Sequence, residues 1–294
     1  RTMIQSRTEN QPSAPTKNNQ GKRQKTQQDR EATKAAKKQY KDVFLRELRA
    51  RVQHAVTTTT PFHERLVNFW SNHFTVSIKK AGAAGVVGAF EREAIRPRVT
   101  GTFLEMLVAS STHPAMLLYL DNAQSTGPNS AFGRRGQKGI NENLAREILE
   151  LHTLGVNGGY TQADVTSFAN IITGWTIAKN PKQDNVGEFA FDANHHEPGA
   201  QVVLGKTYDQ PGVEQGMAVL RDIAASPSTA RFIATKLARH FIADTPPKEA
   251  VDALAATFSQ SGGDLAAVYR TLIDLPQAWS VATPKIKGSY DLVV

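Results

Sequence analysis

The stretch from Asn141 to Gly155 constrains the fold most strongly, because its side chains repeat at the period of an α-helix. Steps of three and four residues place four polar side chains on one stripe of that helix: Asn143, Arg146, Glu147 and Glu150. The opposing stripe is apolar and consists of Leu144, Ile148, Leu151 and His152. The pattern predicts an amphipathic helix whose polar face is too regular to serve solubility alone.

Helix start signals recur along the rest of the chain. Thr60 and Pro61 read as an N-cap and a first helical residue, and they precede apolar residues at helical spacing that include His73. Capping boxes at 102–105 and 161–164 start further helices, and proline or Gly-Asp signals do so near 114, 227, 247 and 264. We therefore expect a mainly α fold, built as a multi-helix, bundle-like domain.

One short region predicts strands instead. Residues 188–192 and 201–208 alternate or are β-branched, and the turn-rich segment 193–199 lies between them. We expect one small β-hairpin inserted among the helices. The run from Gly199 to Thr207 looks like a phosphate-binding loop, but it has five intervening residues where that loop has four, and no helix start follows it. We interpret it as a strand.

The positive charge of the chain is concentrated at its beginning. The 294 residues carry a formal charge of +8, and residues 1–60 hold 14 Lys and Arg against 5 Asp and Glu, whereas residues 61–294 hold 21 against 22. We expect a disordered basic tail at 1–28 and a single mainly helical domain at 29–294. A solvated tail explains the excess charge without nucleic acid, which is therefore not the expected partner.

Composition and missing motifs exclude several classes of protein. There is no cysteine, which excludes disulfides, Cys-ligated zinc, iron–sulfur clusters and thiol nucleophiles. No apolar run approaches the ~20 residues that span a bilayer, and no signal peptide is visible, so the chain as given is expected to be soluble with no membrane span. Dinucleotide and nucleophile-elbow motifs are absent, and Pro198 after His196 and Glu197 forbids the helix of a zinc-protease motif.

A scattered set of acid–base groups and potential metal ligands remains: His73, His113, the Glu147 and Glu150 pair, His195 and His196. Imidazole and carboxylate together suit zinc, iron or manganese if they converge. For His73 alone, a buried ring hydrogen-bonded to the backbone is the simpler interpretation. Arg146 and Glu147 fit a structural ion-pair network as well as a functional role.

Six blocks in a fixed order resemble one bacterial family: FWSNHF at 69–74, HPAMLLYLDN at 113–122, NENLARE at 141–147, GGYT at 158–161, TGW at 173–175 and HEPG at 196–199. The family is the domain of unknown function eighteen hundred, and the resemblance covers roughly residues 30–294. It implies a mainly helical domain, and by the same resemblance we expect this chain to end inside the family's last helix. Family members often carry an export signal, which implies a periplasmic or secreted protein, and often sit beside genes for a sulfatase-like family.

The resemblance implies nine candidate site residues in this chain, which lie within the matching blocks: Asn72, His73, Asp121, Asn122, Asn143, Arg146, Glu147, Trp175 and His196. This chain has Gln201 where family sequences often have lysine, and His152 where an aromatic residue is also common. Neither of these two positions is therefore a site candidate.

Two functions remain open. In the first, the protein is an exported metal-dependent enzyme of unknown reaction: His73, Glu147 and His196 bind a divalent metal, and Arg146 or Asn143 orients an anionic substrate or a metal-bound water. In the second, it is a non-catalytic helical scaffold or accessory protein that binds a sulfatase-like partner. The same polar residues then serve as buried hydrogen-bond networks.

Overall fold

Helices dominate the described part of the chain, as the start signals predict. The protein is represented by a computed structural model, which describes residues 18–80, 83–136, 139–180 and 185–280. The longer helices are α1 (Asn18–Thr57), α2 (Pro61–His73), α4 (Phe103–Thr112), α7 (Gln162–Ile171), α8 (Val213–Ala224), α9 (Pro227–Phe241), α10 (Lys248–Gln260) and α11 (Leu265–Asp274). The shorter ones are α3 (Val87–Phe90), α5 (Pro114–Tyr119) and α6 (Asn143–Glu147). The mainly α fold class is therefore confirmed.

Short helical turns of other types join these helices. Two are π-helices, η2 (Glu91–Ile95) and η6 (Ile148–Thr153). The 3₁₀ turns are η1 (Ala83–Gly85), η3 (Arg96–Arg98), η4 (Asn122–Gln124), η5 (Gly133–Arg135) and η7 (Pro276–Trp279). The turns η4 and η5 lie in a part of the chain rich in Gly, Ser and Asn.

Local capping explains where several helices begin. Thr102 and Thr161 each accept a hydrogen bond from the third residue of their helix, whose carboxylate bonds back to the cap, so both predicted capping boxes form. Ser226 caps α9, and Asp264 caps α11. Thr60 makes no cap hydrogen bond; its hydroxyl pairs with that of Thr58, and α2 begins on the preset backbone of its proline.

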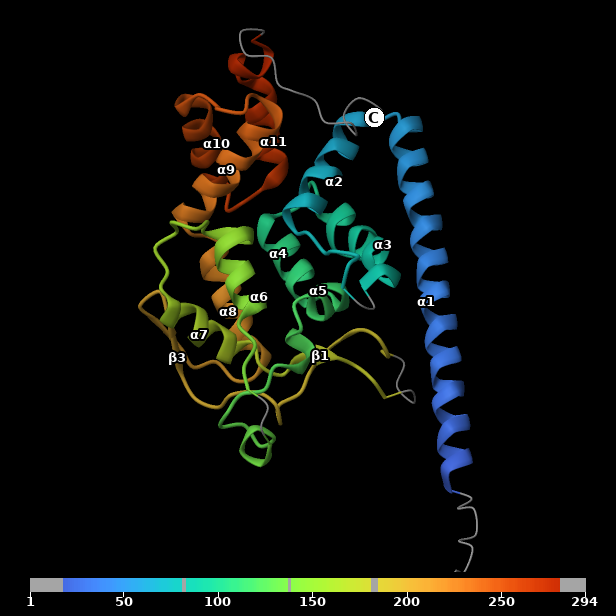
Figure 1. The fold of residues 1–294 in the computed structure, drawn as a ribbon. Coiled ribbons are helices and arrows are strands. Elements are labelled where there is room, and N and C mark those ends of the chain that lie inside the picture. The colour runs from blue at the N-terminus through green and yellow to red at the C-terminus, as the bar shows by residue number, and fades with distance from the viewer. Residues whose placement is uncertain (1–17, 81–82, 137–138, 181–184, 281–294) are drawn as a thin grey trace, which may run out of the picture.

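Most helices form one body around an aromatic and aliphatic core, and α1 runs along one side of it (Figure 1). The largest fully buried side chains include Trp70, Phe74, Phe103, Phe168 and Trp175. The helices α9, α10 and α11 lie at one end of the body, and the strands lie toward the other (Figure 1). The C-terminal half of α1 packs near α2 and α3, whereas its N-terminal half extends past the body, and the side chains of residues 30–35 are exposed.

The strands pair differently from the hairpin that the sequence predicts. The strand β2 (Phe189–Phe191) pairs with β1 (Trp175–Ile177), and β3 (Gln201–Val203) pairs with β4 (Lys206–Tyr208), both antiparallel. Leu204 and Gly205 have positive φ angles of 51° and 75°, the backbone of a tight two-residue turn. The segment 201–208 therefore folds back on itself, and 188–192 pairs with residues that precede it.

The predicted tail at 1–28 falls partly outside the described residues. Residues 1–17 are not described, and residues 18–28 belong to α1. The last residues, 281–294, also lie outside the described part of the chain. The proposed boundary between a tail and a single domain thus stays a prediction.

Candidate functional site

The helix predicted at 141–155 begins as the α-helix α6 and continues as the π-helix η6. The change of helix type alters which side chains face the core. After α6, the π-helix η6 is closed by a 3.0 Å bond from the Leu154 amide to the carbonyl of Leu149, five residues earlier. The extra residue in the turn rotates the following side chains relative to an α-helix. Leu149 is consequently buried, while Leu151, expected on the apolar stripe, is 44% exposed.

Of the predicted polar stripe, Arg146 is the residue that bonds to α7. The Arg146 guanidinium donates 2.9 Å hydrogen bonds to Glu142 and Gln162, and Glu142 also accepts a 2.7 Å bond from the Thr166 hydroxyl. The backbone N–H of Asn143 donates to the side-chain oxygen of Asn141 at 2.9 Å. The bonds of Arg146 and Glu142 tie the start of α6 to α7, as a structural network would.

Glu147 stands apart from that network. Its side chain is half-buried. Among the described residues, hydrogen bonds do not contribute to the shift of its pKa. Burial, and after it the charge of nearby Glu150, raises the pKa of Glu147 above the usual glutamate value. The Glu150 carboxylate accepts a 3.3 Å bond from the Tyr160 hydroxyl. Of the sequence candidates, Glu147 is the one with the character of an acid–base group.

His73 is a core histidine. Its side chain is 5% exposed, and Nε2 lies 3.0 Å from the carbonyl oxygen of His152. Burial, then the positive charge of Lys236 and the His152 ring, holds the pKa of His73 well below its usual value. The His152 ring is also buried, and burial and the charge of Lys236 lower its pKa to about 3. Nδ1 of both rings has no hydrogen-bond partner.

His196 anchors the turn between β2 and β3. Its Nδ1 lies 3.1 Å from the carbonyl of Thr173, and the neighbouring Glu197 carboxylate accepts bonds of 2.8 and 2.5 Å from the amide and side chain of Asn129. Gly174 has a φ of 79°, and a Cβ there would lie 2.5 Å from the carbonyl of Asp192. Position 174 thus requires glycine. The turn is held by the His196 contact with Thr173 and by the Glu197 bonds to Asn129.

Three further candidates hold the fold, and one faces solvent. The buried Asn122 amide donates 3.2 Å bonds to the carbonyls of Ile172 and Trp175, and the Trp175 ring is fully buried. Asp121 has a φ of 59° and pairs with Lys80 at 2.5 Å. Asn72 is exposed and lines the groove described below.

The three predicted metal ligands do not come together into one site in the structure. Among the residues that the structure describes, no group of three or more His, Asp or Glu side chains could hold a metal ion, so His73, Glu147 and His196 do not form one. Each histidine uses one ring nitrogen on a backbone carbonyl. This arrangement does not fit a three-ligand site, and the assignment of catalytic and metal roles stays a prediction.

A groove lies where α1 meets the body. It encloses about 530 Å³ between α1, the end of α2, α3 and η2. Its apolar lining consists of Phe44 and Leu48 of α1 and of Val76, Val87 and Phe90 of the body. The Glu47 carboxylate lies against the backbone of Gly88, where a Cβ would overlap it. Apolar side chains from both α1 and the body therefore line the groove, with charged side chains beside them.

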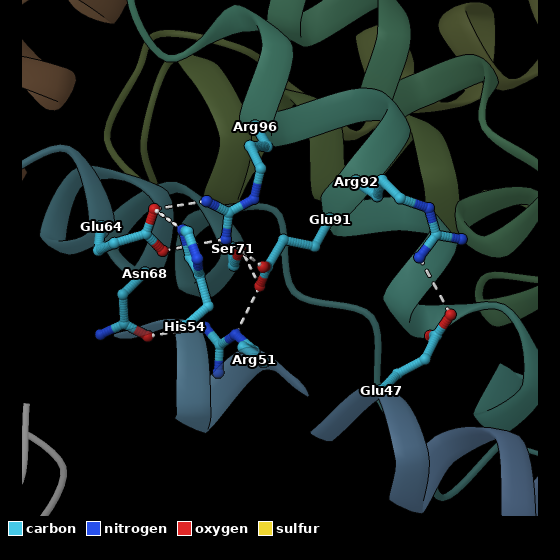
Figure 2. A network of polar contacts seen from close by, with 9 residues as sticks. All are labelled: Glu47, Arg51, His54, Glu64, Asn68, Ser71, Glu91, Arg92 and Arg96. Atoms are coloured by element: carbon cyan, nitrogen blue, oxygen red, sulfur yellow. Dashed lines mark hydrogen bonds and ion pairs between the residues drawn. The ribbon is translucent and has the colours of Figure 1, made fainter. Parts of the chain in front are cut away.

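A network of ion pairs forms part of the groove lining and connects α1 to the body (Figure 2). Arg96 donates to both oxygens of Glu64, at 2.5 and 3.0 Å, and to Glu91 at 3.0 Å. Arg51 of α1 donates to Glu91 at 2.6 Å and to Asn68 at 3.0 Å. Burial alone would raise the pKa of Glu64, but its bonds and charge interaction with Arg96 outweigh burial and lower it.

Sequence reasoning missed the network and Lys236. The partners Arg51, Glu64 and Arg96 come from α1, α2 and η3, so no spacing rule links them. Lys236 lies on α9 with its Nζ 5.2 Å from the centroid of the Phe232 ring, and burial lowers its pKa. The apolar residues around it in the sequence were the available signal, because they place this lysine beside a buried face.

Comparisons with known proteins agree with the resemblance. A model of the family described as protein of unknown function (DUF1800) matches residues 1–294. Neither the curated proteins nor the solved structures gave a match. No helix in the described part of the chain combines the length and apolarity needed to cross a bilayer. Because the family model spans the whole sequence, the chain belongs to the DUF1800 family of proteins of unknown function.

Proposed function

We propose that the protein is a non-catalytic helical accessory protein that binds a protein partner through the outer face of α1. The observation that carries this proposal is an exposed apolar stripe on α1, formed by Leu45, Val52 and Val56, which are 36%, 37% and 56% exposed. Their spacing of seven and four residues keeps them on one side of the helix. A stripe of this kind on the surface is typical of an interaction site.

The same face of α1 continues as a basic stripe. Lys34, Lys38 and Lys41 precede Leu45 by steps of three and four residues, and all three lysines are exposed. A complementary partner would present an acidic patch that continues into an apolar patch, in the manner of a helix packing along a groove. The residue chemistry of α1 therefore defines the partner surface.

The partner's class and location come from the family resemblance alone. It implies a sulfatase-like protein as the partner and a periplasmic or secreted site of action. The basic half of the α1 stripe would contact an acidic surface of that partner. Most site candidates also have roles inside the fold, because Arg146, Asn122 and His196 all bond to neighbouring segments. This supports an accessory role over a catalytic one.

The test is a binding titration of the full chain with a purified sulfatase-like protein from the same organism. Leu45→Glu combined with Val52→Glu should weaken binding at least tenfold, because both side chains lie on the stripe and are exposed, so the fold is retained. Val156→Glu is the control, since Val156 is 66% exposed and lies outside α1. Equal binding by the double variant and the wild type would refute the stripe as the interface.

A metal-dependent enzyme is the alternative function. The observation that favours it is Glu147, whose raised pKa and nearby Glu150 suit an acid–base group or a metal ligand. Elemental analysis of the purified protein tests it, with Glu147→Gln and His73→Gln compared at matched folding by circular dichroism. About one metal ion per chain that both variants lose would establish metal binding. Protein without metal in all three samples would contradict it.

A further inference from the structure

The groove beside α1 has the dimensions of a small-molecule site. Its volume of about 530 Å³ lies within the range of roughly 300–1,000 Å³ that is usual for ligand pockets. Its apolar walls come from two separate parts of the chain, with Phe44 and Leu48 on one side and Val76, Val87 and Phe90 on the other. An apolar molecule between these walls would bury surface on both sides.

The charged residues of the groove are already paired with one another. Glu91 accepts bonds from Arg51, Arg96 and Ser71. Arg92 pairs with Glu47 at 3.0 Å. A charged ligand would either stay unpaired on desolvation or displace one of these partners, and both are unfavourable. The lining thus favours an uncharged ligand.

Asn72 supplies a neutral polar group at the same groove. It lies in the last turn of α2, its side chain is exposed, and it lines the groove together with Ser71 and Thr75. A primary amide both donates and accepts hydrogen bonds, so it suits a hydroxyl or an amide on the ligand. Apolar walls and a neutral polar group together match an amphipathic molecule without charge.

We infer that this groove binds an uncharged small amphipathic molecule, with an apolar body between Phe44 and Phe90 and a hydroxyl or amide end at Asn72. The site is separate from the outer stripe of α1, because Leu45, Val52 and Val56 do not line it. Binding needs no partner protein. The inference can therefore succeed or fail independently of the accessory function.

The experiment measures displacement of the neutral dye Nile red from the full chain by three ligands with the same octyl chain: 1-octanol, nonanoate and octyltrimethylammonium. We expect 1-octanol to bind at least tenfold more tightly than either ion. Similar or tighter binding of an ion would overturn the inference, as would failure of the dye and 1-octanol to bind.

Three variants test whether the ligand binds in the groove. Thr75→Trp should block the groove and reduce binding of 1-octanol at least tenfold, because Thr75 lines the groove and is exposed. Thr207→Trp adds the same side chain at an exposed position of β4, outside the groove, and should bind as the wild type does. Asn72→Leu should weaken 1-octanol several-fold. Unchanged binding by the Thr75 variant would put the ligand elsewhere and refute the site.

Discussion

Nε2 of His73 lies 3.0 Å from the carbonyl oxygen of His152, and this contact assigns the proton on the His73 ring. A carbonyl oxygen only accepts hydrogen bonds, so Nε2 carries the hydrogen and Nδ1 is left with a lone pair. Nδ1 of His73 and Nδ1 of His152 are both buried, and neither has a hydrogen-bond partner. A second proton on either ring would therefore place an unpaired charge in the aromatic core.

The stability of the protein should consequently fall when the pH drops below about 6.5. The folded pKa values of His73 and His152 are lowered, that of His152 to about 3. Stability is fully present above the unfolded pKa, because both rings are neutral in both states. Below it, the unfolded chain takes up protons that the folded chain does not, which removes about 1.4 kcal/mol per pH unit for each histidine. Urea unfolding at pH 7.5, 6.5 and 5.5 measures this dependence.

The variant His152→Phe provides the control for this dependence. Phenylalanine has a similar shape and does not titrate, so the slope between pH 6.5 and 5.5 should fall by roughly a third to a half. His73 and His113, whose pKa values burial also lowers, keep their contribution. Glu147, whose pKa is raised, contributes with the opposite sign at lower pH and is unchanged in the variant. An identical slope in the variant and the wild type would show that His152 titrates normally in the folded protein.

Local signals in the sequence predicted much of the fold. The capping boxes at Thr102 and Thr161 form, and α2 and α9 begin at the prolines Pro61 and Pro227. The buried, backbone-bonded interpretation of His73 also agrees with the structure. Each of these features depends on residues within about one helical turn, or on the apolar face of one helix. Such information is present in a single sequence.

Other features depend on pairings that no local pattern encodes. The π-turn of η6 exposes Leu151, and nothing in helical spacing distinguishes it from a continued α-helix. Strand pairing was mispredicted because the tight turn at Leu204 and Gly205 closes its own hairpin. Contacts between distant segments, such as Glu64 with Arg96, depend on how the helices pack. The candidate site was therefore the least predictable part of the molecule.

The substitution Tyr269→Phe should destabilise the protein by about 1–3 kcal/mol. The Trp70 indole donates a 2.6 Å hydrogen bond to the Tyr269 hydroxyl, and both side chains are buried. Removing the hydroxyl leaves the indole N–H without an acceptor in a core that joins α2 to α11. Urea unfolding followed by tryptophan fluorescence measures the change. Tyr160→Phe is the matched control and should have a smaller effect, because its 3.3 Å bond to Glu150 is only partly buried.

The substitution Glu91→Gln should loosen the C-terminal half of α1 while the body stays folded. The Glu91 carboxylate accepts from Arg51 of α1 at 2.6 Å, whereas Arg96 keeps its two bonds to Glu64. Backbone amides of α1 between 48 and 57 should exchange with deuterium roughly tenfold faster, as expected for weaker local packing. Glu93→Gln is the control on the same π-helix, since Glu93 is 59% exposed. Equal exchange in both variants would show that the network does not hold α1.

Lys236 should be carbamylated by cyanate faster than the exposed lysines of the chain. Burial lowers its pKa, so a larger fraction of its side chain is the reactive free amine at pH 8. Lys248 is the comparison, because its side chain is 74% exposed and pairs with Asp252 at 2.5 Å. Peptide mapping by mass spectrometry at limiting cyanate gives both rates.

The coupling of Lys236 to the histidines provides a second readout for the same lysine. Its positive charge lowers the pKa of His73 and His152, so Lys236→Met should raise both folded pKa values. The folded variant then takes up protons at higher pH than the wild type, and its loss of stability on acidification should level off sooner. A variant with an unchanged pH profile, together with Lys236 reacting no faster than Lys248, would show that the amine is an ordinary solvated lysine. Fast carbamylation with a flattened profile would instead establish that the half-buried charge of Lys236 lowers the pKa of both histidines.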